Sequence, residues 1–382
     1  MRTLVLDDDP AIGRFVCRAA QTAGFQTQSA TRIEAFRSHY HATRPDVIVL
    51  DLQIGADDGI EQLRFLNEQH FSNPILLMSG FDGRVLNSAQ QIGREMGLDI
   101  AAAFTKPIRL DEITTLFVRL AQQLRPLSSE RVLDGVHANE LFLEYQPIVE
   151  RRPRSVIMLE ALVRWNHPAH GRLAPDKFIP LAEESAETID ALTDSVLAMA
   201  ARDYVRFRAA GIETSIAVNV SGKNLDQLDF PDRVESILRQ AQVPPERFSL
   251  ELTETVASSD HVNNMDVFSR LRLKGFGLAI DDFGTGYSSL KRLRQLPFSG
   301  IKIDRSFVAD LLTSRDSAAI VKSVADLARN MQLDCIAEGV ETEQIAQILE
   351  SFGVRKQQGY LFARPQSAER IETWLKEWKQ AA

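Results

Sequence analysis

Short apolar runs of strand length alternate with amphipathic helical segments along almost the whole chain of 382 residues, and this alternation limits the possible folds most. The run Val47–Leu50 contains no polar residue, as expected for a strand that is buried on both faces. Helical spacing is clearest in Arg315–Met331, where Ile320, Val324 and Leu327 share one face. Repeated strand–helix units indicate α/β domains with mainly parallel sheets.

The N-terminal part of the chain predicts an open, doubly wound parallel sheet. The expected strands are Thr3–Leu6, Gln26–Ser29, Val47–Leu50, Ile75–Met78 and Ala102–Phe104, and the clearest expected helices are Ile12–Thr22 and Asp111–Leu124. Proline and serine break this pattern in Arg125–Ser129, which looks like a junction. We therefore expect one domain over residues 1–123, a linker over 124–130 and a second domain over 131–382.

The second domain predicts a modified TIM-like (β/α)8 barrel, entered through an expected helical stretch at Glu130–Glu140. Its strand candidates are Phe142–Ile148, Val156–Val163, Ser215–Val220, Ser249–Leu252, Leu278–Ile280, Gly300–Ile303, Cys335–Ala337 and Gly359–Phe362. Only Val149–Ser155 separate the first two strands, which is too short for a helical crossover. The first strand pair should therefore be antiparallel.

Polar side chains lie at or beside the carboxyl ends of these barrel strands. They are Glu160, Asn219, Glu251, Asp281, Asp282, Lys302 and Glu338. In a barrel these strand ends converge on one face, where ligand sites form. Any single acid at such a position is often only a helix cap or a loop charge. From Asn219 onward, however, the separations are each close to one strand–helix unit, so convergence is the more economical interpretation.

Several carboxylates and one amide in a small space would repel one another without cations, and oxygen ligands of this kind suit Mg²⁺ or Mn²⁺. A carboxylate shared between two ions allows a two-metal site for phosphoryl chemistry. Lys302 is suited to orient a water, and Glu338 is suited to accept a proton. No histidine falls in this set, which argues against a histidine-rich zinc site. We expect His167 and His170 on a surface loop.

A second polar set follows the strands of the N-terminal domain. Its members are Asp7, Asp8, Asp51, Ser79 and Lys106, which a doubly wound sheet gathers at one edge. Three acids, a hydroxyl and a lysine suit one Mg²⁺ and a phosphoryl group, with Asp51 as the nucleophile and Asp8 as a metal ligand. The alternative is that these residues are solvated loop charges.

The charge balance disfavours a nucleic-acid partner, because 52 acids against 44 lysines and arginines give a net charge of −8. No helix-turn-helix with a basic face follows the first domain, so we expect no DNA binding. Acids at Asp7–Asp9 leave no room for a signal peptide, and no window holds 18 apolar residues. We expect a cytoplasmic protein without membrane association. Cys17 and Cys335 are too few for a disulfide framework.

Residues 130–380 resemble the EAL-domain phosphodiesterases, which hydrolyse cyclic di-GMP to linear pGpG. The matching segments are Tyr145–Ile148, Glu160–Trp165 with its Glu-Ala-Leu signature, Asn219, Glu251–Glu254, Asp281–Gly286, Lys302–Asp304, Glu338–Glu341 and Gln358–Tyr360. The resemblance implies two Mg²⁺ or Mn²⁺ ions per site. One is expected on Glu160, Asn219, Glu251 and Asp281, and the second on Asp281 and Asp282.

The same resemblance assigns roles to the other residues of the set. Lys302 is expected to hold the nucleophilic water, and Glu338 to act as the general base. Arg164, Gln146 and Gln358 are expected to contact the substrate, and Glu254 and Glu341 to support the site. Some EAL domains only bind cyclic di-GMP and signal through a partner; those usually lack metal ligands that this chain keeps. An active enzyme is therefore favoured over a silent effector.

Residues 1–123 resemble the receiver domains of response regulators, through Pro45–Leu52 and Asp58-Gly59. This resemblance implies a flavodoxin-like fold, phosphorylation at Asp51 by a sensor histidine kinase, and a site for one Mg²⁺ and the phosphoryl group. That site is expected to contain Asp7, Asp8, Gln53, Ser79 and Lys106.

Two positions depart from the receiver pattern. Gly55 stands where the family usually has proline, and Ala103 stands where a switch aromatic is common. The signal would then leave through another surface, such as Asp111–Leu124 and the junction. Because receiver and EAL domains commonly dimerise, we expect a homodimer or a higher homo-oligomer. The glycine-containing loop Asp282–Tyr287 is the candidate relay between oligomer contacts and the metal site.

Overall fold

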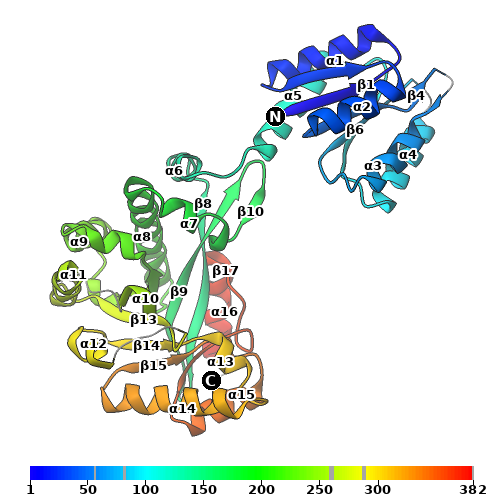
Figure 1. Ribbon diagram of the computed structural model, residues 1–382. Helices are drawn as coiled ribbons and strands as arrows, with labels where there is room; N and C mark the ends of the chain where they lie inside the picture. The colour runs from blue at the N-terminus through cyan, green and yellow to red at the C-terminus, as the bar shows by residue number, and fades with distance from the viewer. Residues whose placement is uncertain (56, 81–82, 258–261, 286–289, 381–382) are drawn as a thin grey trace. The chain divides into compact units, whose positions relative to one another are not determined.

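The computed structural model describes residues 1–382 except 56, 81–82, 258–261, 286–289 and 381–382 (Figure 1). Contacts divide the chain into two compact units, Met1–Pro126 and Leu127–Ala382, and each is described by itself. Among the helices in the described ranges, none combines the length and the apolar character that a membrane span requires.

The N-terminal unit is a parallel sheet of five strands with helices on both faces. Its strand order is β2 (Gln26–Ala30), β1 (Arg2–Leu6), β3 (Val47–Asp51), β6 (Ile75–Ser79) and β7 (Ile100–Thr105). Its helices are α1 (Pro10–Thr22), α2 (Ile33–Thr43), α3 (Gly59–Glu68), α4 (Gly83–Glu95) and α5 (Leu110–Leu124), and β4 (Gln53–Ile54) pairs with β5 (Asp57–Asp58). The expected doubly wound sheet is confirmed.

The apolar run in β3 explains why this sheet is covered on both faces. Ile48 and Leu50 pack into one hydrophobic cluster, whereas Val47 and Val49 pack into a second cluster on the opposite face. Side chains alternate between the two faces of a strand, so an unbroken apolar run needs helices on each side. Burying the central strand in this way leaves its polar end, at Asp51, at the edge where the other parallel strands also end.

The C-terminal unit is a closed barrel of eight strands, and its first strand pair is antiparallel as expected. The barrel strands are β8 (Leu141–Arg151), β9 (Arg154–His167), β11 (Ser215–Asn219), β12 (Phe248–Thr253), β13 (Gly277–Phe283), β14 (Gly300–Ile303), β15 (Asp334–Ala337) and β16 (Lys356–Gln358). Strand β8 runs antiparallel to both β9 and β16, and the other barrel pairs are parallel. Short strands β10 (Gly171–Leu173) and β17 (Gln366–Ser367) extend the sheet beside β9 and β8.

Helices and 3₁₀ turns connect the barrel strands and cover their outer face (Figure 1). They are α6 (Ser129–His137), η1 (Pro175–Lys177), α7 (Ile179–Ala182), α8 (Ala186–Ala209), η2 (Gly222–Asp226), α9 (Phe230–Gln240), η3 (Pro245–Arg247), α10 (Glu254–Ala257), α11 (Val262–Leu273), α12 (Leu290–Gln295), α13 (Arg305–Ala309), α14 (Arg315–Asn330), α15 (Glu343–Ser351) and α16 (Ala368–Gln380). Side chains at Ser185, Ser314 and Thr342 accept backbone N–H groups at the starts of α8, α14 and α15. These caps satisfy backbone donors that a helix start leaves unpaired.

Two sequence expectations about this unit are wrong. The last barrel strand is Lys356–Gln358 and not Gly359–Phe362, which forms a tight turn. Gly359 passes so close to the chain that an added Cβ would lie 2.1 Å from the Val340 carbonyl oxygen. His167 is buried at the end of β9, where its ring packs edge-on against Trp165, and is not on a surface loop. His170 is exposed, as expected.

Candidate active site

The barrel brings the predicted polar residues together at the carboxyl ends of its strands. Glu160 lies on β9, Asn219 on β11, Glu251 on β12, Asp281 and Asp282 on β13, Lys302 on β14, and Glu338 directly after β15. In the parallel ladders Asn219 stands beside Glu251, and Asp281 stands beside Thr253, two residues after Glu251. A cavity of ≈ 470 Å³ opens at this end, and Glu160, Asp281, Asp282 and Glu338 line it.

Lys302 is the centre of this cluster, and its side chain is fully buried. Its Nζ lies 2.6 Å from Glu338 Oε1, 2.7 Å from Glu251 Oε2, 3.3 Å from Asp281 Oδ1 and 3.4 Å from Glu160 Oε2. Burial disfavours the ammonium form, but the surrounding carboxylates outweigh burial and raise the pKa of Lys302 well above its usual range. The lysine is therefore a fixed positive charge among four acids.

One buried cation does not neutralise these acids. Burial raises the pKa of Glu338 to about 8 although Lys302 opposes the shift, and burial also raises the pKa of Glu251 well above its usual range. Burial, together with the negative charge of Asp281, raises the pKa of Asp282 to about 6. The buried Oε1 of Glu251 has no hydrogen-bond partner among the described residues. The acids at this site are therefore only partly neutralised, and the site can bind further positive charge.

Two overlapping groups of acids are suited to hold that charge. Glu160, Glu251 and Asp281 each place one oxygen within 4.8 Å of the others, and so do Asp281, Asp282 and Glu338. Asp281 belongs to both groups, as a carboxylate shared by two ions requires. Hard oxygen donors without sulfur or imidazole are the ligands that Mg²⁺ and Mn²⁺ prefer. The donor set therefore fits a pair of such ions.

Amide side chains hold Glu160 in place. Asn219 Nδ2 donates to Glu160 Oε1 at 2.8 Å, and Gln358 Nε2 donates to Glu160 Oε2 at 2.6 Å. Gln358 Nε2 also lies 3.1 Å from Gln146 Oε1, whose own Nε2 donates to the Ala363 carbonyl oxygen. Both glutamines line the cavity. Because each carboxylate oxygen has a fixed donor, the orientation of Glu160 is set before any ligand binds.

The remaining predicted residues lie around this centre. Glu341 lines the cavity, and Glu254 Oε2 accepts the Gly284 N–H at 2.8 Å, which holds the start of the expected relay loop. Gly286 and Tyr287 of that loop lie outside the described residues. Arg164 is tied to Glu144, with Arg164 Nε 3.0 Å from Glu144 Oε2.

Three polar side chains that line the cavity were not assigned a role from the sequence: Asp304, Arg305 and Tyr360. Each is close in sequence to a residue that was predicted, because Asp304 and Arg305 follow Lys302 and Tyr360 follows Gln358. That proximity was the available signal. It was not sufficient, because the direction of a side chain after a strand end depends on the turn that follows.

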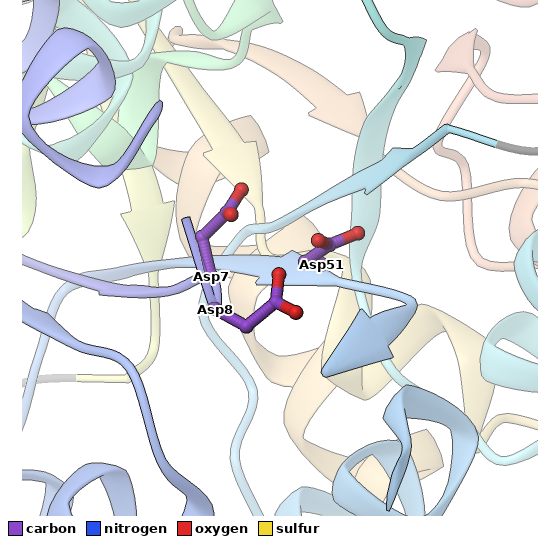
Figure 2. Close-up of side chains that lie close together, drawn as sticks. All are labelled: Asp7, Asp8 and Asp51. Carbon is purple, nitrogen blue, oxygen red and sulfur yellow. The ribbon is translucent and has the colours of Figure 1, made fainter. Parts of the chain in front are cut away.

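The N-terminal unit forms a second acidic site, which Figure 2 shows in close-up. Asp7, Asp8 and Asp51 each place one oxygen within 4.8 Å of the others. Lys106 Nζ lies 2.8 Å from Asp7 Oδ2 and 2.7 Å from Asp51 Oδ2, and burial raises the pKa of Asp7. Ser79 is fully buried at the end of β6. The expected acids and lysine are therefore together, and they fit one Mg²⁺ and an anionic group.

Two neighbours of Asp51 complete this second site. The Gln53 N–H donates to Asp51 Oδ1 at 3.3 Å, while the Gln53 side chain is exposed, so its contact with Asp51 is through the backbone. The Gly55 N–H donates to Asp8 Oδ2 at 3.0 Å, and a proline at position 55 would remove this donor. The departure from the receiver pattern at Gly55 therefore adds a contact that holds Asp8.

Comparisons with known proteins agree with both halves of the structure. A family model described as EAL domain matches residues 129–365, and one described as response regulator receiver domain matches residues 3–117. The curated protein "Cyclic di-GMP phosphodiesterase RocR" of Pseudomonas aeruginosa is 31% identical over 378 residues, and the match covers 96% of each chain.

Other matches cover the C-terminal part. "Cyclic di-GMP phosphodiesterase NbdA" of Pseudomonas aeruginosa is 39% identical over 265 residues; the match covers 69% of this chain and 34% of NbdA, so the chain spans about a third of that relative. A solved structure, "PaMucR Phosphodiesterase, c-di-GMP complex", is 37% identical with a TM-score of 0.60 and covers 63% of this chain and 99% of that chain. The chain therefore belongs to the EAL-domain family and carries a response regulator receiver domain before its EAL domain.

Proposed function

We propose that this protein is a two-component response regulator that hydrolyses cyclic di-GMP to linear pGpG, with two divalent ions at the EAL site and control by phosphorylation of Asp51. The observation that carries the proposal is the meeting of four carboxylates around buried Lys302 in a cavity at the strand ends. RocR, which is named a cyclic di-GMP phosphodiesterase, matches along 96% of both chains.

The donor set suggests how the ions are held. Glu160, Asn219, Glu251 and Asp281 would hold one Mg²⁺ or Mn²⁺, and Asp281 with Asp282 would hold the second. The unpartnered Oε1 of Glu251 and the raised pKa values of Glu251 and Asp282 support this assignment. When bound, such ions supply Lewis acidity that stabilises negative charge on the phosphate and on the attacking water.

The chain's own groups then complete the hydrolysis. Lys302 orients the water, and Glu338 accepts its proton as the water oxygen bonds to phosphorus. Glu338 Oε1 lies 2.6 Å from Lys302 Nζ, so the proposed base stands next to the group that orients the water. The bond from phosphorus to the 3′-oxygen breaks, the 3′-oxygen takes a proton from solvent water and leaves as a hydroxyl, and the phosphate stays on the 5′-oxygen. Gln146, Gln358 and Arg164 hold the substrate, with Glu254 and Glu341 in support.

Metal removal provides the direct test. We expect the purified protein with Mg²⁺ or Mn²⁺ to convert cyclic di-GMP to pGpG, with product formation measured by chromatography. Excess EDTA should stop the reaction. Adding the metal back after dialysis should restore turnover, which excludes irreversible damage as the cause. Tight binding of cyclic di-GMP without product under all metal conditions would contradict the proposal and favour the silent effector.

Control by the receiver predicts a second outcome. Lys106 forms ion pairs with both Asp51 and Asp7, so a phosphoryl group on Asp51 would change the contacts of this lysine. We expect acetyl phosphate, or a cognate sensor kinase with ATP, to change EAL turnover by about fivefold or more. The matched variant Asp51→Asn should not respond. An equal response in both proteins, or no response in fully phosphorylated wild type, would contradict receiver control. Chromatography of both proteins with light scattering reports on the expected homo-oligomer.

A further inference from the structure

Two arginines share one buried carboxylate beside the cavity. Glu144, on β8, is only 5% exposed, and its Oε2 accepts both Arg164 Nε at 3.0 Å and the guanidinium of Arg172 on β10. Arg164 also donates to the Val163 carbonyl oxygen at 2.9 Å, so its position is fixed by two contacts. Of these three residues, only Arg164 has a role predicted from the sequence.

The strand register places this group next to the cavity. Glu144 pairs with Leu162 across the β8–β9 ladder, and Leu162 lines the cavity together with Glu160. Side chains two residues apart lie on the same face of a strand, so Arg164 follows Glu160 and Leu162 on that face. Arg172 pairs with Asn166 of β9, the next position on the same face. The two arginines therefore lie on the same face of the sheet as the cavity lining, further along it from the carboxylates.

The charges of this group do not cancel. Two guanidinium groups share one carboxylate, which leaves one net positive charge, and each guanidinium has five N–H donors. The Arg164 side chain is 13% exposed and the Arg172 side chain is 56% exposed, so free donors of Arg172 face solvent. The Arg172 guanidinium carbon also lies 5.8 Å from the centroid of the Phe142 ring, so two contacts hold this side chain while more than half of it is exposed. Planar guanidinium groups bind phosphate with two parallel hydrogen bonds.

We infer that Arg172 binds the non-scissile phosphate of the cyclic dinucleotide beside Arg164, and that Glu144 is the positioning residue that holds both guanidinium groups. The inference rests on the proposed function, because a cyclic dinucleotide carries two phosphates and the carboxylate cluster serves only the one that is cleaved. The second phosphate needs positive charge outside the metal site. Arg172 supplies it on the face that continues the cavity.

The experiment compares two substrates. We expect Arg172→Ala to raise KM for cyclic di-GMP about tenfold, the loss typical of one charged hydrogen bond, and to leave kcat within about twofold. Arg172→Lys should recover part of this loss. Bis(p-nitrophenyl) phosphate has a single phosphate, so its kcat/KM should not respond to the change. The exposed Arg239→Ala on α9 is the matched control and should leave both substrates unaffected.

Glu144→Gln tests the positioning role. It keeps a neutral acceptor but loses the charge, so KM for cyclic di-GMP should rise by about three- to tenfold while kcat stays near that of the wild type. An unchanged KM in Arg172→Ala, or an equal loss on both substrates in either variant, would overturn the inference. If the wild type binds but does not hydrolyse cyclic di-GMP, the proposed function fails separately. In that case, calorimetry with Mg²⁺ measures the dissociation constant of cyclic di-GMP for each protein. The ratios of variant to wild type should equal those expected for KM.

Discussion

Glu160→Ala is expected to lower kcat for cyclic di-GMP on the order of a thousandfold, which corresponds to about 4 kcal/mol of transition-state stabilisation. Glu160 belongs to the group of acids suited to the first ion, and it lies 3.4 Å from Lys302. Its removal also takes away one hydrogen-bond acceptor from each of Asn219 and Gln358. The measurement is pGpG formation by chromatography at saturating substrate over a series of Mg²⁺ concentrations.

Two further variants make this result specific. Glu160→Gln keeps the size of the side chain but removes its charge, so it should lose nearly as much activity as the alanine variant. Glu213→Ala, at an exposed position, should retain full activity and shows that loss of a carboxylate is not harmful in general. Calorimetric titration with Mn²⁺ should give fewer bound ions in both Glu160 variants. Full turnover in Glu160→Ala would remove Glu160 from the proposed metal site.

Spacing along the chain was enough to predict which residues meet in the barrel. Asn219, Glu251 and Asp281 each lie at or near the carboxyl end of one strand of a repeated unit, and parallel strands must bring such ends to one face. The short segment between β8 and β9 was likewise enough to predict their antiparallel pairing. These predictions depend only on backbone geometry, which can be inferred from the spacing of hydrophobic residues.

Contacts between side chains could not be predicted in the same way. The sequence did not indicate that Arg164 and Arg172 share Glu144, because that contact depends on the register of three strands. The last strand was misplaced by a few residues because Gly359–Phe362 is as apolar as a strand. The close approach of Gly359 to Val340, which makes it a turn, is a tertiary contact.

Lys302→Met is expected to destabilise the metal-free protein by about 3–5 kcal/mol, the usual cost of leaving buried charges without their partner. Four carboxylates lie within 3.4 Å of Lys302 Nζ, and they would keep their mutual repulsion without this cation. Mg²⁺ or Mn²⁺ should recover much of the lost stability, because the ions neutralise the same carboxylates. Turnover should remain low even with metal, since the proposed water-orienting group is gone.

Urea denaturation of wild type, Lys302→Met and the exposed control Lys322→Met, each with EDTA and with Mn²⁺, measures this effect. The gain in unfolding free energy on adding Mn²⁺ should be larger in Lys302→Met than in the other two proteins. Without metal, the variant should also become more stable as the pH falls from 8 to 6. Burial already raises the pKa of Glu338 to about 8 and that of Glu251 well above its usual range, so these acids take up protons in the folded state at a pH where the unfolded chain does not. If Lys302→Met matched the wild type in stability at pH 8 without metal, the four carboxylates would not depend on this lysine, and the central charge balance of the site would be wrong.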